Sequence, residues 1–142
     1  MKYGRAAVAA TPQDDHQRAA ILNNLGAVLG MRFRHGGNLA DLDDAIAIFR
    51  KAVEIAPASH PGRVTFLGNL GNSLGNRIDR TDDPADLDEY IAVYRSAAEV
   101  AGADHPLRTE ILTRLDKGLR IRFQRIGDRA DAEEVLHIEE MG

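Results

Sequence analysis

The sequence repeats itself every 45 residues, and this period constrains the fold more than any other feature. Shifting the chain by one period aligns it with itself without a gap. Three sets of identical residues share the register: Arg18, Arg63 and Arg108; Leu25, Leu70 and Leu115; Asp41, Asp86 and Asp131. A period of this length is typical of small units that cannot bury an apolar face alone and therefore stack on their neighbours.

The register divides the chain into units. Residues 1–13 correspond to the end of a preceding unit, because "YGRAAVAATP" (3–12) falls on "IFRKAVEIAP" (48–57). Full units follow at 14–58 and 59–103, and a shortened one at 104–142. We therefore expect a single repeat domain over residues 1–142, and its ragged ends suggest a segment of a longer array.

Each unit reads as two helices. Apolar residues at helical spacing predict first helices over 17–35, 61–80 and 106–126. Pro61 and Pro106 suit a first helical turn, and Ser59 and Asp104 just upstream are candidate caps.

The second helix of each unit begins near the aspartate that recurs in register, since carboxylates are favoured at helix N-termini. Pro57 ends one of these helices and Gly102 another. No segment shows the alternation of a strand. The sequence therefore predicts an all-α fold of antiparallel helix pairs, stacked as an α-solenoid.

Three glycines fall within "FLGNLGNSLGNRI" (66–78), although each costs a helix about 1 kcal/mol relative to alanine. Gly68, Gly71 and Gly75 share one helical face. We expect this bare face to let a packed neighbour come close, so that added contacts offset the cost. The alternative is a locally weak helix.

Residue types that carry chemistry are few. The chain has no cysteine, and the glycine-rich segment lacks the Lys-Ser/Thr pair of a phosphate-binding loop. His60 and His105 recur in register, each before a proline, which indicates a structural cue. The acidic clusters at helix starts lack the glycine and spacing of a calcium loop. We expect no catalytic residue, no metal and no cofactor.

Charge and hydropathy limit the partners. A formal net charge of −4 provides no general attraction to nucleic acid or to anionic membranes. No apolar run approaches the length of a membrane span, and the N-terminus lacks the apolar stretch of a signal peptide. We therefore expect neither a nucleic-acid nor a membrane partner, and a cytoplasmic location.

The motifs "GNLGNSL" (68–74) with "DLDEYIAVYRSA" (86–97), and "NNLGAVL" (23–29) with "DLDDAIAIFRKA" (41–52), resemble the tetratricopeptide repeat. The usual unit has 34 residues, so whole extra turns would lengthen the helices here. The long units are similar to arrays associated with CHAT domains and to those of kinesin light chains. In the third unit, "TRLDKGL" (113–119) departs from the pattern by placing Asp116 at the glycine position.

The resemblance implies a right-handed superhelix that acts as a non-catalytic protein-interaction module within a larger signalling or effector protein. It also places certain side chains of the first helices on a concave groove for an extended peptide: Asn24, Asn69, Asn72, Asn76, Arg114 and Lys117. Amides at one end and cations at the other suit an acidic peptide. Two alternatives stay open. The arginines could pair with neighbouring acidic helices, and exposed repeat ends could make the chain a self-assembling, homo-oligomeric arm.

Overall fold

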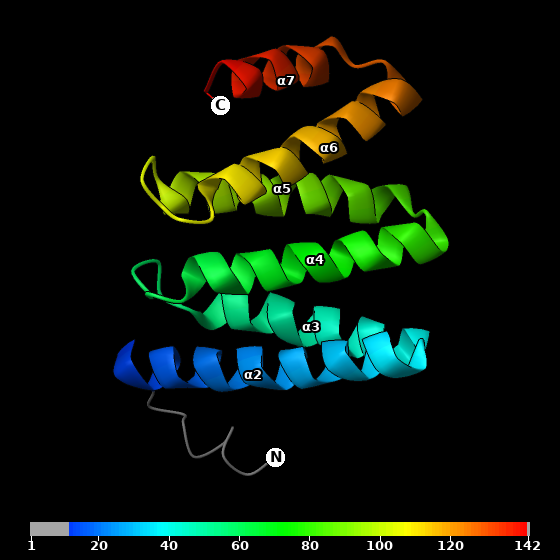
Figure 1. Cartoon of the computed structure of the whole chain (residues 1–142). Coiled ribbons are helices and arrows are strands. Elements are labelled where there is room, and N and C mark those ends of the chain that lie inside the picture. Colours follow the sequence, from blue (N-terminus) through cyan, green and yellow to red (C-terminus); the bar gives the residue numbers. More distant parts are fainter. Residues whose placement is uncertain (1–11, 142) are drawn as a thin grey trace. The chain divides into compact units, whose positions relative to one another are not determined.

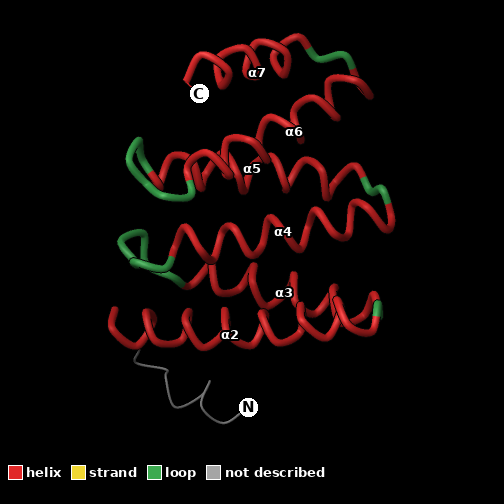
Figure 2. Tube along the Cα trace, in the orientation of Figure 1, coloured by secondary structure: helices red, strands yellow, loops and turns green. Residues whose placement is uncertain are grey.

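The computed structural model describes residues 12–141, and this part of the chain is helical with no strand (Figures 1 and 2). The helices carry the labels of Figure 1: α2 (Pro12–Gly36), α3 (Leu39–Ile55), α4 (Arg63–Thr81), α5 (Pro84–Ala101), α6 (Arg108–Ile126) and α7 (Arg129–Met141). The predicted all-α fold of helix pairs is confirmed. The preceding half-unit assigned to residues 1–13 lies almost wholly outside the described residues.

The chain forms two compact units whose boundary falls inside α4, one ending at Asn69 and the other beginning at Leu70. In the first, α2 packs against α3, and in the second, α6 packs against both α5 and α7. The single domain and the right-handed superhelix stay predictions.

The turn inside each helix pair has the same construction three times. The first helix ends at a residue with positive φ, which is Gly37 (69°), Asp82 (57°) or Gly127 (76°). The next residue caps the second helix with its side chain, accepting a backbone hydrogen bond at 2.9 Å: Asn38, Asp83 and Asp128. The cap therefore lies three residues before the aspartate that marked the helix start in the sequence.

The turn between units is built on histidine. The Nδ1 atom of His60 accepts a hydrogen bond from the Gly62 amide at 2.8 Å, and His105 does the same for Leu107 at 3.0 Å. No side chain caps α6, so the predicted cap by Asp104 is wrong. Because histidine occupies the turn, α4 and α6 begin two residues after their prolines.

Helix α2 begins at Pro12, five residues before the predicted start. The register explains the difference, since His16 stands where the other units have the proline of the turn. Without that proline the helix continues backwards, and Asp14 and Asp15 favour its first turn electrostatically.

The glycines face aromatic rings of the second helices. A Cβ atom on Gly26 would lie 2.6 Å from the ring of Phe49, and one on Gly71 would lie 2.5 Å from the ring of Tyr94. Both rings are buried, so a methyl group has no room there. The predicted close approach is thus real at Gly71. It is wrong for Gly68, where nothing lies within 4 Å.

We expect opposite effects when these two glycines are replaced by alanine. Gly71→Ala overpacks the contact with Tyr94 and should lower the free energy of unfolding by about 1–3 kcal/mol. Gly68→Ala meets open space and should raise it by up to about 1 kcal/mol through helix propensity. Urea denaturation followed by circular dichroism measures both changes. Equal effects for the two variants would contradict the packing role of Gly71.

Candidate functional site

Two predicted groove residues, Asn24 and Asn69, lie in the first compact unit, which ends at Asn69, and only one of them is exposed. Asn24 is exposed on α2. Asn69 is half-buried, and its Nδ2 atom donates to Oδ1 of Asn23 at 2.9 Å. One amide of the predicted set therefore serves packing between helices α4 and α2.

In the second compact unit, a hydrogen bond from a buried tyrosine orients the side chain of Asn72. The Tyr94 hydroxyl donates to Oδ1 of the exposed Asn72 at 3.0 Å. The only acceptor atom of the amide is thereby engaged, while its two N–H donors remain available. Asn76, half-buried, follows one turn later on the same helix.

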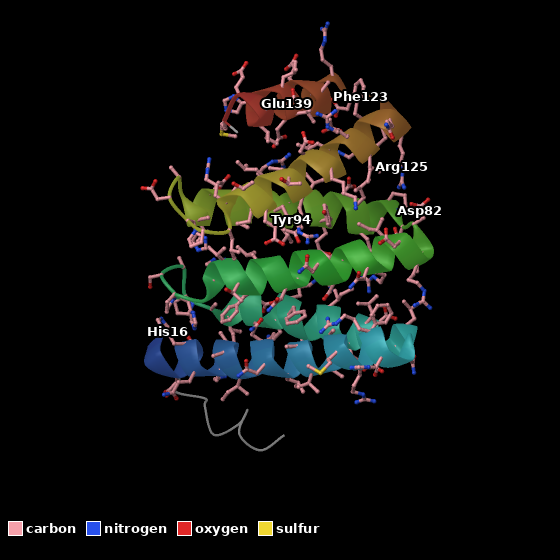
Figure 3. All side chains as sticks on the ribbon, in the orientation of Figure 1. His16, Asp82, Tyr94, Phe123, Arg125 and Glu139 are labelled. Carbon is pink, nitrogen blue, oxygen red and sulfur yellow. The ribbon has the colours of Figure 1, made fainter. Side chains whose placement is uncertain are left out.

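Arg114 from α6 completes this arrangement. Burial raises the pKa of both Tyr90 and Tyr94, and the nearby Arg114 guanidinium partly opposes that rise. The two rings pack edge to face with their centroids 4.8 Å apart. The structure thus brings together Asn72 of α4, the two tyrosines of α5 and Arg114 of α6; Tyr94 is labelled in Figure 3.

Most of the other cations on α6 are engaged in ion pairs. The Nε and Nη2 atoms of Arg122 donate hydrogen bonds to the carboxylate of Asp131 at 2.9 and 2.8 Å. Its Nη1 atom donates to Asp88 at 3.0 Å. These hydrogen bonds raise the pKa of the guanidinium and lower that of the buried Asp131 carboxyl. Arg77 grips Asp86 in the same way, with both distances at 2.8 Å.

Three further arginines of α6 are also occupied. Arg120 bridges Asp116 and Glu139, and Arg125 pairs with Asp82; Glu139, Arg125 and Asp82 are labelled in Figure 3. Arg108 donates to the backbone oxygen of Gly102 at 3.1 Å. The contacts of Arg120 and Arg125 with carboxylates favour the alternative in which arginines pair with nearby acidic groups, whereas Arg108 binds a carbonyl oxygen, which that alternative did not include.

Two predicted cationic groove residues remain available. Arg114 is partly exposed, and its guanidinium interacts with Glu110 at 3.2 Å and with the hydroxyls of Tyr90 and Tyr94 beside it. Lys117 is exposed, and no ion pair involves it within the described part of the chain. Both belong to α6 and lie three residues apart, so they share one helical face.

The sequence analysis missed that a second set of arginines in register, Arg32, Arg77 and Arg122, pairs with the recurrent aspartates. The signal was present, because each arginine precedes its aspartate by the same nine residues. The first unit has the same pair, Arg32 and Asp41, in a looser form at 3.5 Å.

A cavity of about 640 Å³ opens between α6 and α7. Its lining includes Leu112, Asp116, Ile138, Glu139 and Met141. The Oδ1 atom of Asp116 is buried and has no hydrogen-bond partner. Over residues 12–141 there is no cluster of three or more side chains that could hold a metal ion.

Comparison with protein families identifies one repeat directly. Residues 18–62 match the family model of the tetratricopeptide repeat, and the match covers one whole period. The chain contains a tetratricopeptide repeat. Comparisons with curated proteins and with solved structures gave no match. The tetratricopeptide resemblance is confirmed, and the similarity to CHAT-associated and kinesin-light-chain arrays stays a prediction. None of the described helices is long and apolar enough to cross a bilayer.

We expect the ion pair of Arg122 and Asp131 to make the free energy of unfolding fall at acidic pH. The folded-state pKa of Asp131 is lowered below 3.8, so its contribution is complete above that pH and is lost as pH falls. Asp131→Asn should cost about 2 kcal/mol at neutral pH and flatten the acid limb of the stability curve. Urea denaturation across a pH series measures this. The exposed Asp104→Asn is the control, and an acid limb unchanged by Asp131→Asn would contradict the assignment.

Proposed function

We propose that the chain is a non-catalytic module that binds a peptide or protein partner on the face formed by Asn72, Tyr94, Arg114 and Lys117. Tetratricopeptide repeats generally mediate protein–protein interactions. The observation that carries the proposal is the hydrogen bond from the Tyr94 hydroxyl to Asn72, which holds an exposed amide in one orientation.

The fixed amide suits a peptide backbone. Because Oδ1 of Asn72 accepts from Tyr94, the Nδ2 group presents its donors to an incoming carbonyl oxygen. An amide held in advance loses less conformational entropy on binding than a mobile one. The contact would be independent of the side chains of the peptide and would therefore supply affinity more than selectivity.

The two available cations suit an acidic partner. Arg114 can form a two-pronged hydrogen bond with a carboxylate, and Lys117 adds a point charge one turn further along α6. Glu110 beside Arg114 weakens the local field, so binding should require more than one carboxylate on the partner. We therefore propose a peptide that carries acidic side chains in extended conformation.

We further propose that this module acts in the cytoplasm as a segment of a larger signalling or effector protein. The basis for this proposal is the predicted resemblance of its long units to CHAT-associated and kinesin-light-chain arrays. Burial raises the pKa of Tyr90 and of Tyr94, which keeps both hydroxyls neutral, and this favours recognition over chemistry on this face.

We expect charge reversal on α6 to abolish acidic-peptide binding. Arg114→Glu combined with Lys117→Glu should remove binding of a fluorescent pool of short peptides rich in Asp and Glu, measured by anisotropy, and leave helicity unchanged. Arg34→Glu combined with Arg129→Glu is the matched control, because it changes the net charge equally at two exposed sites elsewhere. Loss of binding in both doubles, or in neither, would refute the assignment.

Asn72→Ala tests the backbone contact separately. It should weaken the binding of acidic and of neutral peptide pools by the same factor, since the amide hydrogen-bonds the peptide backbone. Tyr94→Phe leaves Asn72 in place but removes the hydroxyl that orients its amide. It should weaken the binding of both pools by a smaller factor. A loss confined to acidic peptides would contradict this role of Asn72.

A further inference from the structure

The turns inside the helix pairs and the turns between them use the same local hydrogen bond with different side chains. Inside the pairs, Asn38, Asp83 and Asp128 each accept from the backbone amide two residues later. Between the pairs, His60 and His105 do so with the Nδ1 atom of an imidazole ring. An ordinary aspartate keeps its charge down to about pH 4, whereas an imidazole in an unfolded chain takes up a proton near pH 6.5. The turns between the pairs therefore depend on the group that titrates closest to neutral pH.

Both ring nitrogens of His60 are engaged in a way that only one form of the ring allows. Its Nδ1 atom accepts a hydrogen bond from the Gly62 amide at 2.8 Å. Its Nε2 atom lies 3.0 Å from the backbone carbonyl oxygen of His16, which can only accept. The two bonds together require a neutral ring that carries its proton on Nε2.

The His60 ring also packs against two other rings of the first compact unit. Its centroid lies 4.7 Å from that of His16 on α2, which is labelled in Figure 3, and 4.8 Å from that of Phe66 on α4. Both histidines are only half-buried, so water can bring a proton to them. In the next unit the register places Pro61 where His16 stands, so His105 has no second imidazole at that position.

A proton on Nδ1 of His60 would break the start of α4. The imidazolium ring has two N–H groups and no acceptor, so it cannot bind the Gly62 amide. The added N–H group would instead face another donor. A proton on His16 as well would place two positive rings with their centroids 4.7 Å apart. Because Gly62 directly precedes α4, the lost bond weakens the beginning of that helix.

The charged side chains around this turn have partners of their own. They lie on the three helices that meet there: Asp14, Asp15 and Arg18 on α2, Lys51 and Glu54 on α3, and Arg63 on α4. Asp15 pairs with Arg18 at 3.2 Å, and Lys51 pairs with Glu54 at 3.3 Å. Arg63 donates to the backbone oxygens of Val53 and Ala56, both at 3.1 Å. Carboxylates, lysine and arginine ordinarily keep their charge between pH 5 and 7, so the change in this range falls on the two imidazoles.

We propose that the turn between α3 and α4 is an acid-sensitive switch built from His60 and His16. At neutral pH the neutral His60 ring holds the Gly62 amide and the carbonyl oxygen of His16. When the pH falls below about 6.5, protonation removes the bond to Gly62 and charges the ring pair, so that the turn and the first turn of α4 loosen. The folded turn fits only the deprotonated ring, so its contribution to stability is present above this range and is lost as the pH falls. The first repeat would thus respond to mild acidification.

Thermal melting between pH 7.5 and pH 5.0, followed by circular dichroism, tests the switch. The melting temperature of the unaltered chain should fall as the pH falls through this range. His60→Asn keeps an acceptor oxygen, like Asn38 in another turn, and removes the titrating ring, so it should at least halve the fall. His16→Gln should reduce the fall by a smaller amount, because it removes only the second charge.

His35→Asn and His137→Asn are the matched controls, because both rings are exposed and lie on other parts of the chain. Their melting temperatures should fall as steeply as that of the unaltered chain. A melting temperature that stays constant from pH 7.5 to pH 5.0 overturns the proposal. So does a fall that is as steep in His60→Asn as in the unaltered chain.

Nuclear magnetic resonance of the unaltered chain gives an independent test that needs no variant to fold. At pH 7.5 the ring nitrogen shifts should place the proton of His60 on Nε2. The protection of the Gly62 amide from hydrogen exchange, corrected for the intrinsic pH dependence, should fall at least tenfold when the ring is protonated. The opposite tautomer, or unchanged protection, refutes the switch. Peptide binding through Asn72 and Arg114 should not depend on His60, because both belong to the second compact unit.

Discussion

The contact of an aromatic ring with a glycine governs the packing of the first two helix pairs. Phe49 fills the space that a side chain at Gly26 would take, and Tyr94 does so at Gly71. Burying a large aromatic side chain is worth about 1.5–3 kcal/mol, which outweighs the propensity cost of about 1 kcal/mol for the glycine. In the second pair the same ring also carries the hydroxyl that holds Asn72, so packing and the candidate site share one residue.

The third helix pair replaces both partners of this contact together. Asp116 stands at the glycine position and Glu139 at the ring position, and Arg120 bridges the two carboxylates. A charged bridge fills space less completely than a ring, which is consistent with the cavity there and with the buried, unpaired oxygen of Asp116. This pair keeps the two hydrogen bonds between Arg122 and Asp131. They join α6 and α7 near the turn between them, whereas the cavity lies at the opposite ends of these helices.

Local features of the fold and the close helix approach at Gly71 were predictable, whereas most side-chain partners on other helices were not. The turns at Gly37 and Gly127 follow from short-range chemistry, because glycine adopts positive φ and the next side chain caps the helix. The partner of Asn69 depends on which helices meet and at what height, whereas the constant nine-residue spacing did signal the pairing of Arg122 with Asp131. A stripe pattern gives the face of a helix but not its opposite residue.

The buried core next to the candidate site keeps the charge and orientation of its side chains constant. Burial raises the pKa of Tyr94, so its hydroxyl stays a neutral donor to Asn72 across the physiological pH range. Arginine and lysine keep their charge over the same range. The charge and orientation of these groups therefore change little near neutral pH, and any acid sensitivity of recognition must come from carboxylates, those of the partner and that of Glu110 beside Arg114. The proposed binding of an acidic segment would therefore be constant near neutral pH and would not act as a proton sensor.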